Sequence, residues 1–461
     1  MNAMEKSDSS KVVKKQANKA ALAAAEPVER RDGAKENADL QTAVRTQSRE
    51  AVSQAQGRIR AAVTRNREGK LTALLHHIDT NTLRASFLGL KKSAAPGVDE
   101  MSWSEYAENL ETNLADLRRR IHTGAYRALP SRRKYIPKAD GRQRPLGIAA
   151  LEDKIVQAAV VAILTPIYEA EFLGFSYGFR PRRNQHQALD ALAFGIGKRR
   201  INWILDADIQ SFFDTVSQEW LIRFIEHRVG DRRVVKLIRK WLAAGVLEDG
   251  QVIVTEEGTP QGAVISPLLA NIYLHYVYDL WVQHWRQRSA KGDVIVVRYA
   301  DDTIVGFEHW HEAEQFLADL KMRLARFGLT LHPDKTRLIE FYCANRRDGG
   351  GFVLGRKPVR TRMRAKLREI KGHLQAMQHD GIERQGQWLA QVLRGWLAYY
   401  AVPMSGSAIT AFRHHMIERW LRVLQRRSQR TRRSLSWGRM KRIADHHLPR
   451  PHILHPWPEQ R

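Results

Sequence analysis

Two neighbouring carboxylates lie at the centre of a stretch that has the pattern of a β-hairpin. Residues 294–307 read VIVVRYADDTIVGF, so β-branched runs flank Asp301 and Asp302. This pattern predicts two strands joined by a turn that carries both acids. Adjacent negative charges repel each other, and a bound cation relieves the repulsion. A solvated Asp-Asp turn explains this fragment equally well when it is taken alone.

A second acidic strand favours the cation-binding interpretation. Residues 201–208 read INWILDAD, and because side chains alternate along a strand, Asp206 and Asp208 share one face. Asp208 ends the strand and is followed by Ser211 to Asp214. One carboxylate here and two on a neighbouring hairpin can hold two divalent ions, an arrangement suited to in-line phosphoryl displacement. We expect Mg²⁺, because it takes few protein carboxylates and leaves positions for phosphate oxygens.

A third segment, residues 258–274, has the pattern of a tight turn that leads into an apolar helix. It reads GTPQGAVISPLLANIYL. Glycine lets a backbone approach a ligand closely, and amide groups at a helix start favour phosphate. Taken alone, the segment is better explained as an ordinary loop–helix junction.

The composition indicates a globular chain with a polyanionic partner. The length of 461 residues is enough for two or three packed domains, and the apolar share of 43% is enough for a sizeable core. Lys and Arg number 76 against 49 Asp and Glu, a formal net charge of +27. Nucleic acid is the commonest partner for such a charge, and an anionic membrane surface is the alternative. We find no apolar run long enough to span a bilayer, so we expect no membrane partner.

The cysteine count and the first residues bear on the compartment. Cys343 is the single cysteine, which excludes an internal disulfide and a zinc site built from several cysteines. Residues 1–15 contain no apolar signal core. Both observations favour a cytoplasmic protein.

The positive charge is concentrated near the C-terminus. Residues 356–461 hold 23 Lys or Arg and 6 Asp or Glu, a net charge of +17. Solvated helix faces explain a high charge density but not a one-sided one. We therefore favour a phosphate-binding surface in this part of the chain.

The pattern along the chain divides it into regions. Residues 1–68 have few aromatic residues and little periodic patterning, and predict a flexible or loosely helical basic arm. Residues 151–168 have the apolar spacing of a helix, and residues 201–341 alternate short strands with helices. Residues 362–425 predict three helices, with breaks near Asp380-Gly381 and between Pro403 and Ser407.

Taken in order, these segments resemble the sequence blocks of group II intron-encoded reverse transcriptase/maturases. The resemblance extends from near Leu74 to about Pro458. It is carried by APGVD (95–99), RPLGI (144–148) with LEDK (151–154), FSYGFRP (175–181), DIQSFFD (208–214), GTPQG with SPLLANIYL (258–274), YADD (299–302) and LHPDKT (331–336). Any one block is weak, but their shared order is specific.

The resemblance implies an α+β fold, a right-hand polymerase of the reverse transcriptase type followed by an α-helical domain. Fingers and palm would cover residues 69–341, with a shortened palm–thumb junction at 342–361. The helical thumb, or maturase domain X, would cover 362–425, and a basic DNA-binding tail would cover 426–461.

The resemblance also implies roles for particular residues. The catalytic carboxylates would be Asp208, Asp301 and Asp302, which with Ile209 would bind two Mg²⁺ ions. The nucleotide would be bound by Lys138, Arg144, Phe213, Gln261 and Gly262. Phe213 would exclude a 2′-hydroxyl, although either Phe213 or Phe212 can instead be a core residue. Lys138 and Arg144 would hold the triphosphate, or else form a basic turn on the template path.

The C-terminal region would bind nucleic acid. RNA-binding residues would be Arg362, Arg364, Lys366, Arg368 and Lys371, and DNA-binding residues would be Arg426, Arg427, Arg430, Arg432 and Arg433. Trp396 and Tyr400, spaced i and i+4, are expected in the helix core. The implied partners are group II intron RNA, a DNA target and primer, and deoxynucleoside triphosphates, in a bacterial cytosol.

Two departures from the family pattern affect the functional expectation. The Cys/His nuclease domain carried by many members is expected to be absent, and so is an FLGF-like strand after the sixth block. The leading hypothesis is an RNA-directed DNA polymerase that also assists intron splicing and retrohoming. The alternatives are an RNA-binding splicing cofactor without polymerase activity and a polymerase with a separate cellular role.

Overall fold

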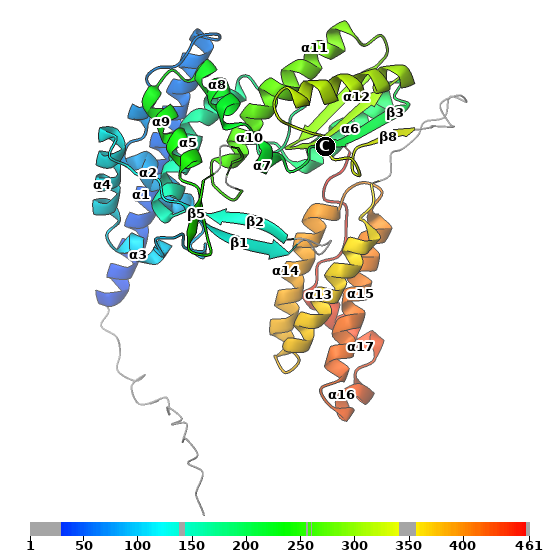
Figure 1. Ribbon diagram of the computed structural model, residues 1–461. Helices are drawn as coiled ribbons and strands as arrows, with labels where there is room; N and C mark the ends of the chain where they lie inside the picture. Colours follow the sequence, from blue (N-terminus) through cyan, green and yellow to red (C-terminus); the bar gives the residue numbers. More distant parts are fainter. Residues whose placement is uncertain (1–28, 138–142, 255–256, 260, 341–355, 458–461) are drawn as a thin grey trace, which may run out of the picture.

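The structure is a computed structural model in which residues 29–137, 143–254, 257–259, 261–340 and 356–457 are described (Figure 1). Within these ranges, the side chains of residues 29–45, 430 and 432 are left out of the description. The fold is α+β, with two four-stranded sheets, many surrounding helices and a separate C-terminal group of helices. No helix in the described ranges has the length and apolar character needed to cross a membrane.

One sheet, the aspartate sheet, contains both acidic strands predicted from the sequence. It is formed by β6 (Val294–Tyr299), β7 (Asp302–Phe307), β3 (Trp203–Asp208) and β8 (Arg337–Glu340), in that order and antiparallel throughout. Helix α6 (Gln185–Lys198) lies against β6, and α12 (Trp310–Ala325) lies against β3 and β7. Alternating residues of β3 and β7, such as Leu205 and Val305, enter the core, so the register of the two strands is fixed.

A second sheet, the hairpin sheet, holds the RPLGI block. Its order is β2 (Gln143–Ile148), β1 (Ser131–Pro137), β4 (Val246–Glu248) and β5 (Gln251–Ile253). Further helices are α2 (Thr80–Gly89), α3 (Trp103–Glu108), α4 (Leu110–Thr123), α5 (Leu151–Glu169), α7 (Phe212–Thr215), α8 (Gln218–Arg228), α9 (Arg232–Ala243), α10 (Ser266–Leu274), the π-helical segment η3 (His275–Asp279) and α11 (Leu280–Arg288). One large core joins this part to the aspartate sheet.

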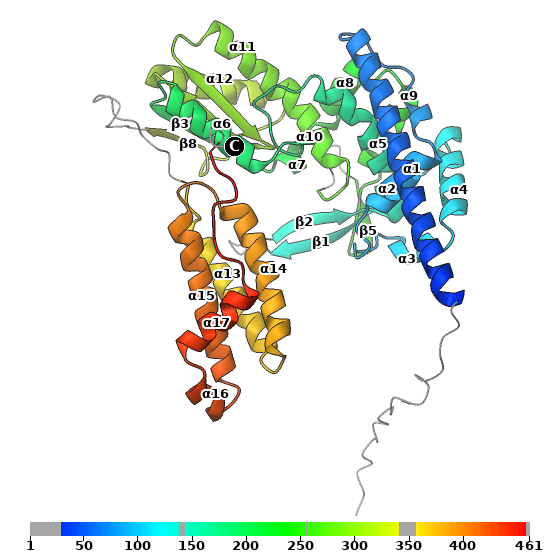
Figure 2. The ribbon, with the colours of Figure 1, turned by 180° about the vertical axis from the view of Figure 1, so that it is seen from behind.

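The predicted flexible arm over residues 1–68 does not hold for its second half. Helix α1 (Glu29–Arg65) lies against α2 and α5, and Figure 2 shows it along their outer side. Ile59 and Val63 are buried in the main core, and the Gln56 side chain donates to the Ala162 carbonyl at 3.0 Å. The apolar residues are spaced by four, so a narrow stripe suffices to attach an otherwise polar helix.

The C-terminal region forms the three helices that the sequence predicts. They are α13 (Arg360–Ala376), α14 (Ile382–Tyr400) and α15 (Gly406–Gln425), with both breaks at the expected places. Their core is separate from the main core and includes Trp420, whose indole donates to Gln385 at 2.8 Å. Trp396 is buried there, as expected, and stacks on Phe412 with ring centroids 4.0 Å apart.

The predicted division at residue 425 does not match the packing. After α16 (Gln429–Ser434), α17 (Trp437–His447) places Met440 and Ala444 in the same core. Residues 449–457 then return to the end of α14, where the Leu454 amide donates to the Ala401 carbonyl at 2.9 Å. Residues 437–457 are therefore part of the C-terminal helical domain. The predicted loss of an FLGF-like strand concerns residues 341–355, which lie outside the described ranges.

Candidate active site

Strand pairing brings the two acidic segments together. In the antiparallel register of β3 and β7, Asp208 stands directly opposite Asp302, at the end of the aspartate sheet. The turn between β6 and β7 consists of Ala300 and Asp301, and Ala300 has a left-handed backbone with φ of 58°. A tight turn of this kind leaves both aspartates at the sheet end, beside Asp208.

Burial, to which neighbouring negative charge adds, raises the pKa of three carboxyls at or near the sheet end. Partial burial, together with the negative charges of Asp301 and Asp208, raises the pKa of Asp302 to about 6. Burial also raises the pKa of Asp301, and the charge of Asp208 adds to this effect. The pKa of Asp206 is raised by burial and by Asp208 as well. The site therefore concentrates negative charge that a cation would stabilise.

Asp208, Asp301 and Asp302 are called the acidic group, and a lysine that was not among the predicted site residues contacts it. Lys335 Nζ lies 2.6 Å from Asp208 Oδ2. It belongs to the LHPDKT block (331–336), which lies beside the end of β3. There the His332 amide donates to the Asp208 carbonyl at 2.8 Å. Ile209, the other predicted metal-site residue, is buried and bridges to Leu331 in the same segment. The place of Lys335 within this sequence block was the signal that could have identified it as a site residue.

The donor chemistry of the acidic group fits Mg²⁺. The described residues contain no set of three or more His, Cys, Asp or Glu side chains arranged to hold one metal ion. Mg²⁺ does not require such a set, because one or two carboxylates commonly bind it while water and phosphate oxygens complete its shell. Asp208 and Asp302 are opposed carboxylates, and Asp208 already attracts the Lys335 ammonium.

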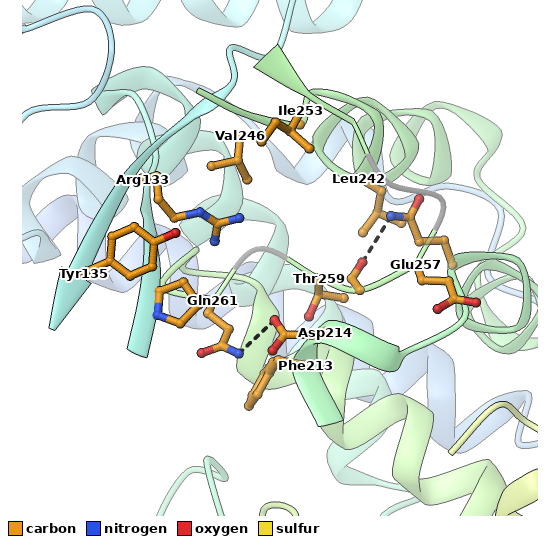
Figure 3. Close-up of a pocket in the computed structure, with 14 residues that line it drawn as sticks. Arg133, Tyr135, Phe213, Asp214, Leu242, Val246, Ile253, Glu257, Thr259 and Gln261 are labelled. Carbon is orange, nitrogen blue, oxygen red and sulfur yellow. Dashed lines mark hydrogen bonds between the residues drawn. The ribbon is translucent and has the colours of Figure 1, made fainter. Parts of the chain in front are cut away.

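A cavity of about 610 Å³ lies between the hairpin sheet and the GTPQG segment (Figure 3). Phe213, Gln261 and Pro145 line it, together with Arg133 and Tyr135 from β1. The alternation of β1 places these last two side chains on one face, so the strand pattern was the signal that could have identified them.

The predicted nucleotide-binding residues of the GTPQG segment are held by backbone and side-chain bonds. Gln261 donates to Asp214 at 3.0 Å, and its carbonyl accepts from the Gly147 amide at 2.6 Å. Gly262 has φ of 105°, and a Cβ there would lie 2.8 Å from the Gly147 carbonyl oxygen, so only glycine fits without strain.

The two phenylalanines of the third block have different surroundings. Phe212 is 2% exposed and belongs to the main core, whereas Phe213 is partly exposed and lines the cavity. Phe212 is therefore the core residue, which leaves Phe213 as the ring available to a ligand.

Arg144, one of the two predicted triphosphate cations, does not line this cavity. Arg144 is exposed on β2, and because neighbouring side chains alternate it lies on the face opposite Pro145. Its positive charge acts instead on Asp301, whose pKa it lowers against the larger effect of burial. Lys138 lies outside the described residues.

Comparison with known proteins identifies the family. A family model described as "Reverse transcriptase (RNA-dependent DNA polymerase)" matches residues 136–380, more than half of the chain. The chain belongs to the reverse transcriptase family. Protein YkfC of Escherichia coli K12 is 35% identical over 310 residues, which cover 60% of this chain and 79% of that protein.

Other relatives place this reverse transcriptase with the group II intron-encoded type. Group II intron-encoded protein LtrA of Lactococcus lactis is 42% identical over 192 residues, 41% of this chain and 30% of LtrA. The Arabidopsis thaliana protein called nuclear intron maturase 2, mitochondrial, is 25% identical over 247 residues, 44% of this chain and 31% of that protein. The chain thus matches less than a third of the length of either intron protein.

The cations predicted to bind RNA are divided between two flanks of α13 in this reverse transcriptase. Leu367, Ile370 and Leu374 face the domain core, which fixes the rotation of the helix. On that geometry, Arg364, Arg368 and Lys371, at i, i+4 and i+7, form one exposed stripe. Arg362 and Lys366 lie on the other flank, and Lys366 pairs with Glu369 at 2.7 Å.

The cations predicted to bind DNA are also in different surroundings. Arg427 is half-buried and donates to the Asp380 carbonyl at the end of the α13–α14 connection, so it supports the fold. Arg426 and Arg433 are exposed. The side chains of Arg430 and Arg432 lie outside the described residues.

Proposed function

We propose that this reverse transcriptase is an active RNA-directed DNA polymerase that copies the RNA of a group II intron and binds that RNA to assist splicing and retrohoming. The observation that carries the proposal is the pairing of Asp208 with Asp302 across two strands, beside Asp301. A protein that only binds RNA has no use for three adjacent carboxylates, of which Asp301 and Asp302 have a raised pKa.

The acidic residues would hold Mg²⁺ at the point where a primer end meets a nucleoside triphosphate. Bound Mg²⁺ would stabilise charge on the attacking 3′-oxygen and on the phosphates. Asp208, Asp301 and Asp302 would fix its position at the sheet end. The Lys335 ammonium, 2.6 Å from Asp208, would move toward the triphosphate once a metal ion neutralises that carboxylate.

The nucleotide would be placed by groups around the cavity and the sheet end. The Phe213 ring would lie under the sugar and exclude a 2′-hydroxyl, while Gln261 and Gly262 would contact the nucleotide or the template base. Arg144 would bind a phosphate on the Asp301 side, where its charge already acts. Lys138 would contribute a second cation to the triphosphate.

Primer extension on an RNA template with Mg²⁺ and deoxynucleoside triphosphates tests the proposal. The native protein should extend the primer, and Asp301→Ala should abolish synthesis while its affinity for RNA stays within about twofold, because counterion release from other residues carries RNA binding. Glu314→Ala is the control, since Glu314 is an exposed carboxylate on α12, outside the acidic strands and the LHPDKT block. Extension by Asp301→Ala at the native rate would refute the assignment.

A second candidate function is an RNA-binding splicing cofactor without polymerase activity. It is favoured by the similarity to a protein named an intron maturase and by the exposed cations of α13. Tight RNA binding with no extension by the native protein would select this function.

A further inference from the structure

A buried arginine stands two residues before the turn that carries the two aspartates. Arg298, on β6, is 1% exposed, and Asp279, from the π-helical segment η3, accepts from its Nε and Nη2 at 2.6 Å each. Nη2 also donates to Ser176 Oγ at 2.7 Å, and Nη1 donates to Asn271 Oδ1 at 3.1 Å. These bonds use four of the five N–H donors of the guanidinium, and the fifth donor bonds to Ala300.

That last bond reaches the turn itself. Arg298 Nη1 donates to the Ala300 carbonyl at 2.8 Å. Ala300 has φ of 58°, a conformation that is costly for a residue with a side chain and persists only where its surroundings impose it. The carbonyl that Arg298 holds is in the peptide group immediately before Asp301, so this bond fixes the orientation from which both aspartates leave the turn.

The FSYGFRP block also packs against this turn, and its Ser176 is one of the partners of Arg298. The Tyr177 amide donates to the Arg298 carbonyl at 2.8 Å, and the Arg298 amide donates to the Phe175 carbonyl at 2.9 Å. A Cβ on Gly178 would lie 2.2 Å from the Ala300 nitrogen, so the loop backbone rests on the turn. Asn271 Nδ2 holds the Gly178 carbonyl at 2.8 Å. One hydrogen-bond network thus joins Arg298, the 175–178 segment and the turn.

We propose that Arg298 is a positioning residue for the polymerase reaction, and that the 175–178 segment completes the same device. The guanidinium holds the strained turn so that Asp301 and Asp302 meet Asp208 in the geometry that the reaction requires. This inference rests on the proposed function. Lysine cannot replace arginine here, because an ammonium has three donors and cannot form the paired contact with Asp279 while also reaching Ala300.

Two pairs of variants test the inference. Arg298→Lys is compared with Arg228→Lys, because Arg228 is also a buried arginine bonded to a carboxylate and to backbone carbonyls. Its partners are Glu171, Gly69 and Asn66, which lie outside the turn and the 175–178 segment. Gly178→Ala is compared with Gly174→Ala, in the same loop, where an added Cβ meets nothing within 4 Å. The readouts are kcat and KM in primer extension and amide hydrogen exchange of residues 299–303 in the protein alone.

Arg298→Lys and Gly178→Ala should each lower kcat by about 10- to 100-fold, as small misplacements of reacting groups do, with KM for the nucleotide within about twofold. Exchange should accelerate in residues 299–303 only, and both controls should stay near native values. A merely structural role would instead accelerate exchange throughout and reduce the active fraction, leaving kcat per active site unchanged.

Native kcat and native turn exchange in folded Arg298→Lys would overturn the inference, and so would equal losses in the controls. If Arg298→Lys does not fold, the glycine pair decides the question by the same criteria. If the native protein extends no primer, the proposed function fails, but local exchange in the turn still decides whether this network holds it.

Discussion

The split arrangement of cations on α13 makes a quantitative prediction about RNA binding. Arg364, Arg368 and Lys371 form one exposed stripe, whereas Lys366 on the other flank is engaged by Glu369. Each phosphate contact contributes about 0.7 to 0.9 to the slope of log affinity against log salt. Replacing the three stripe residues with Gln should therefore reduce that slope by about 2 to 3.

The change can be measured by filter binding of a structured RNA between 50 and 200 mM KCl. Over this fourfold range the native protein should lose about 20- to 40-fold more affinity than the triple variant, as that slope difference requires. Lys366→Gln is the matched control and should leave the slope unchanged, because its charge is already paired within the helix. A triple variant with the native slope, or a Lys366→Gln variant with a reduced one, would refute the stripe as the RNA-binding surface.

Two further predictions concern sugar selection and pH dependence. Phe213→Ala should admit ribonucleotides, raising their kcat/KM relative to deoxynucleotides at least tenfold. Phe212→Ala should chiefly destabilise the fold, because that ring is buried. Unchanged sugar selection in Phe213→Ala would show that another residue excludes the 2′-hydroxyl. Burial raises the pKa of Asp153 to about 6, above its unfolded value, so the native state binds more protons between about pH 4 and 6 and loses stability as pH rises through 6. Relative to Asp153→Asn, the native protein should lose about 1 kcal/mol of unfolding free energy from pH 5 to pH 7; parallel profiles in urea unfolding would contradict this.

Local patterns in the sequence predicted the elements that carry the candidate site. The β-branched runs around Asp301 and Asp302 define a hairpin wherever they occur, because period-two alternation and a short polar turn are local properties. The three C-terminal helices and their breaks follow for the same reason, since apolar spacing and Gly or Pro residues act within a few positions. The order of the blocks then indicated the family that the comparisons show.

Tertiary contacts decided what no local pattern contains. The pairing of Asp208 with Asp302 depends on a strand register between segments almost a hundred residues apart, and the contact of Lys335 with Asp208 depends on a third segment. Residues 46–65 and 437–448 look polar or basic in sequence, yet a few apolar side chains attach them to cores that form elsewhere. Arg298 reads as one more cation in a basic chain. Only its burial among Asp279, Asn271 and Ser176, with its bond to the Ala300 carbonyl, links it to the turn that carries Asp301. The sequence by itself determined which groups can do the chemistry, because residue type and local spacing set it. The fold decided which of them meet, because long-range packing sets distance and burial.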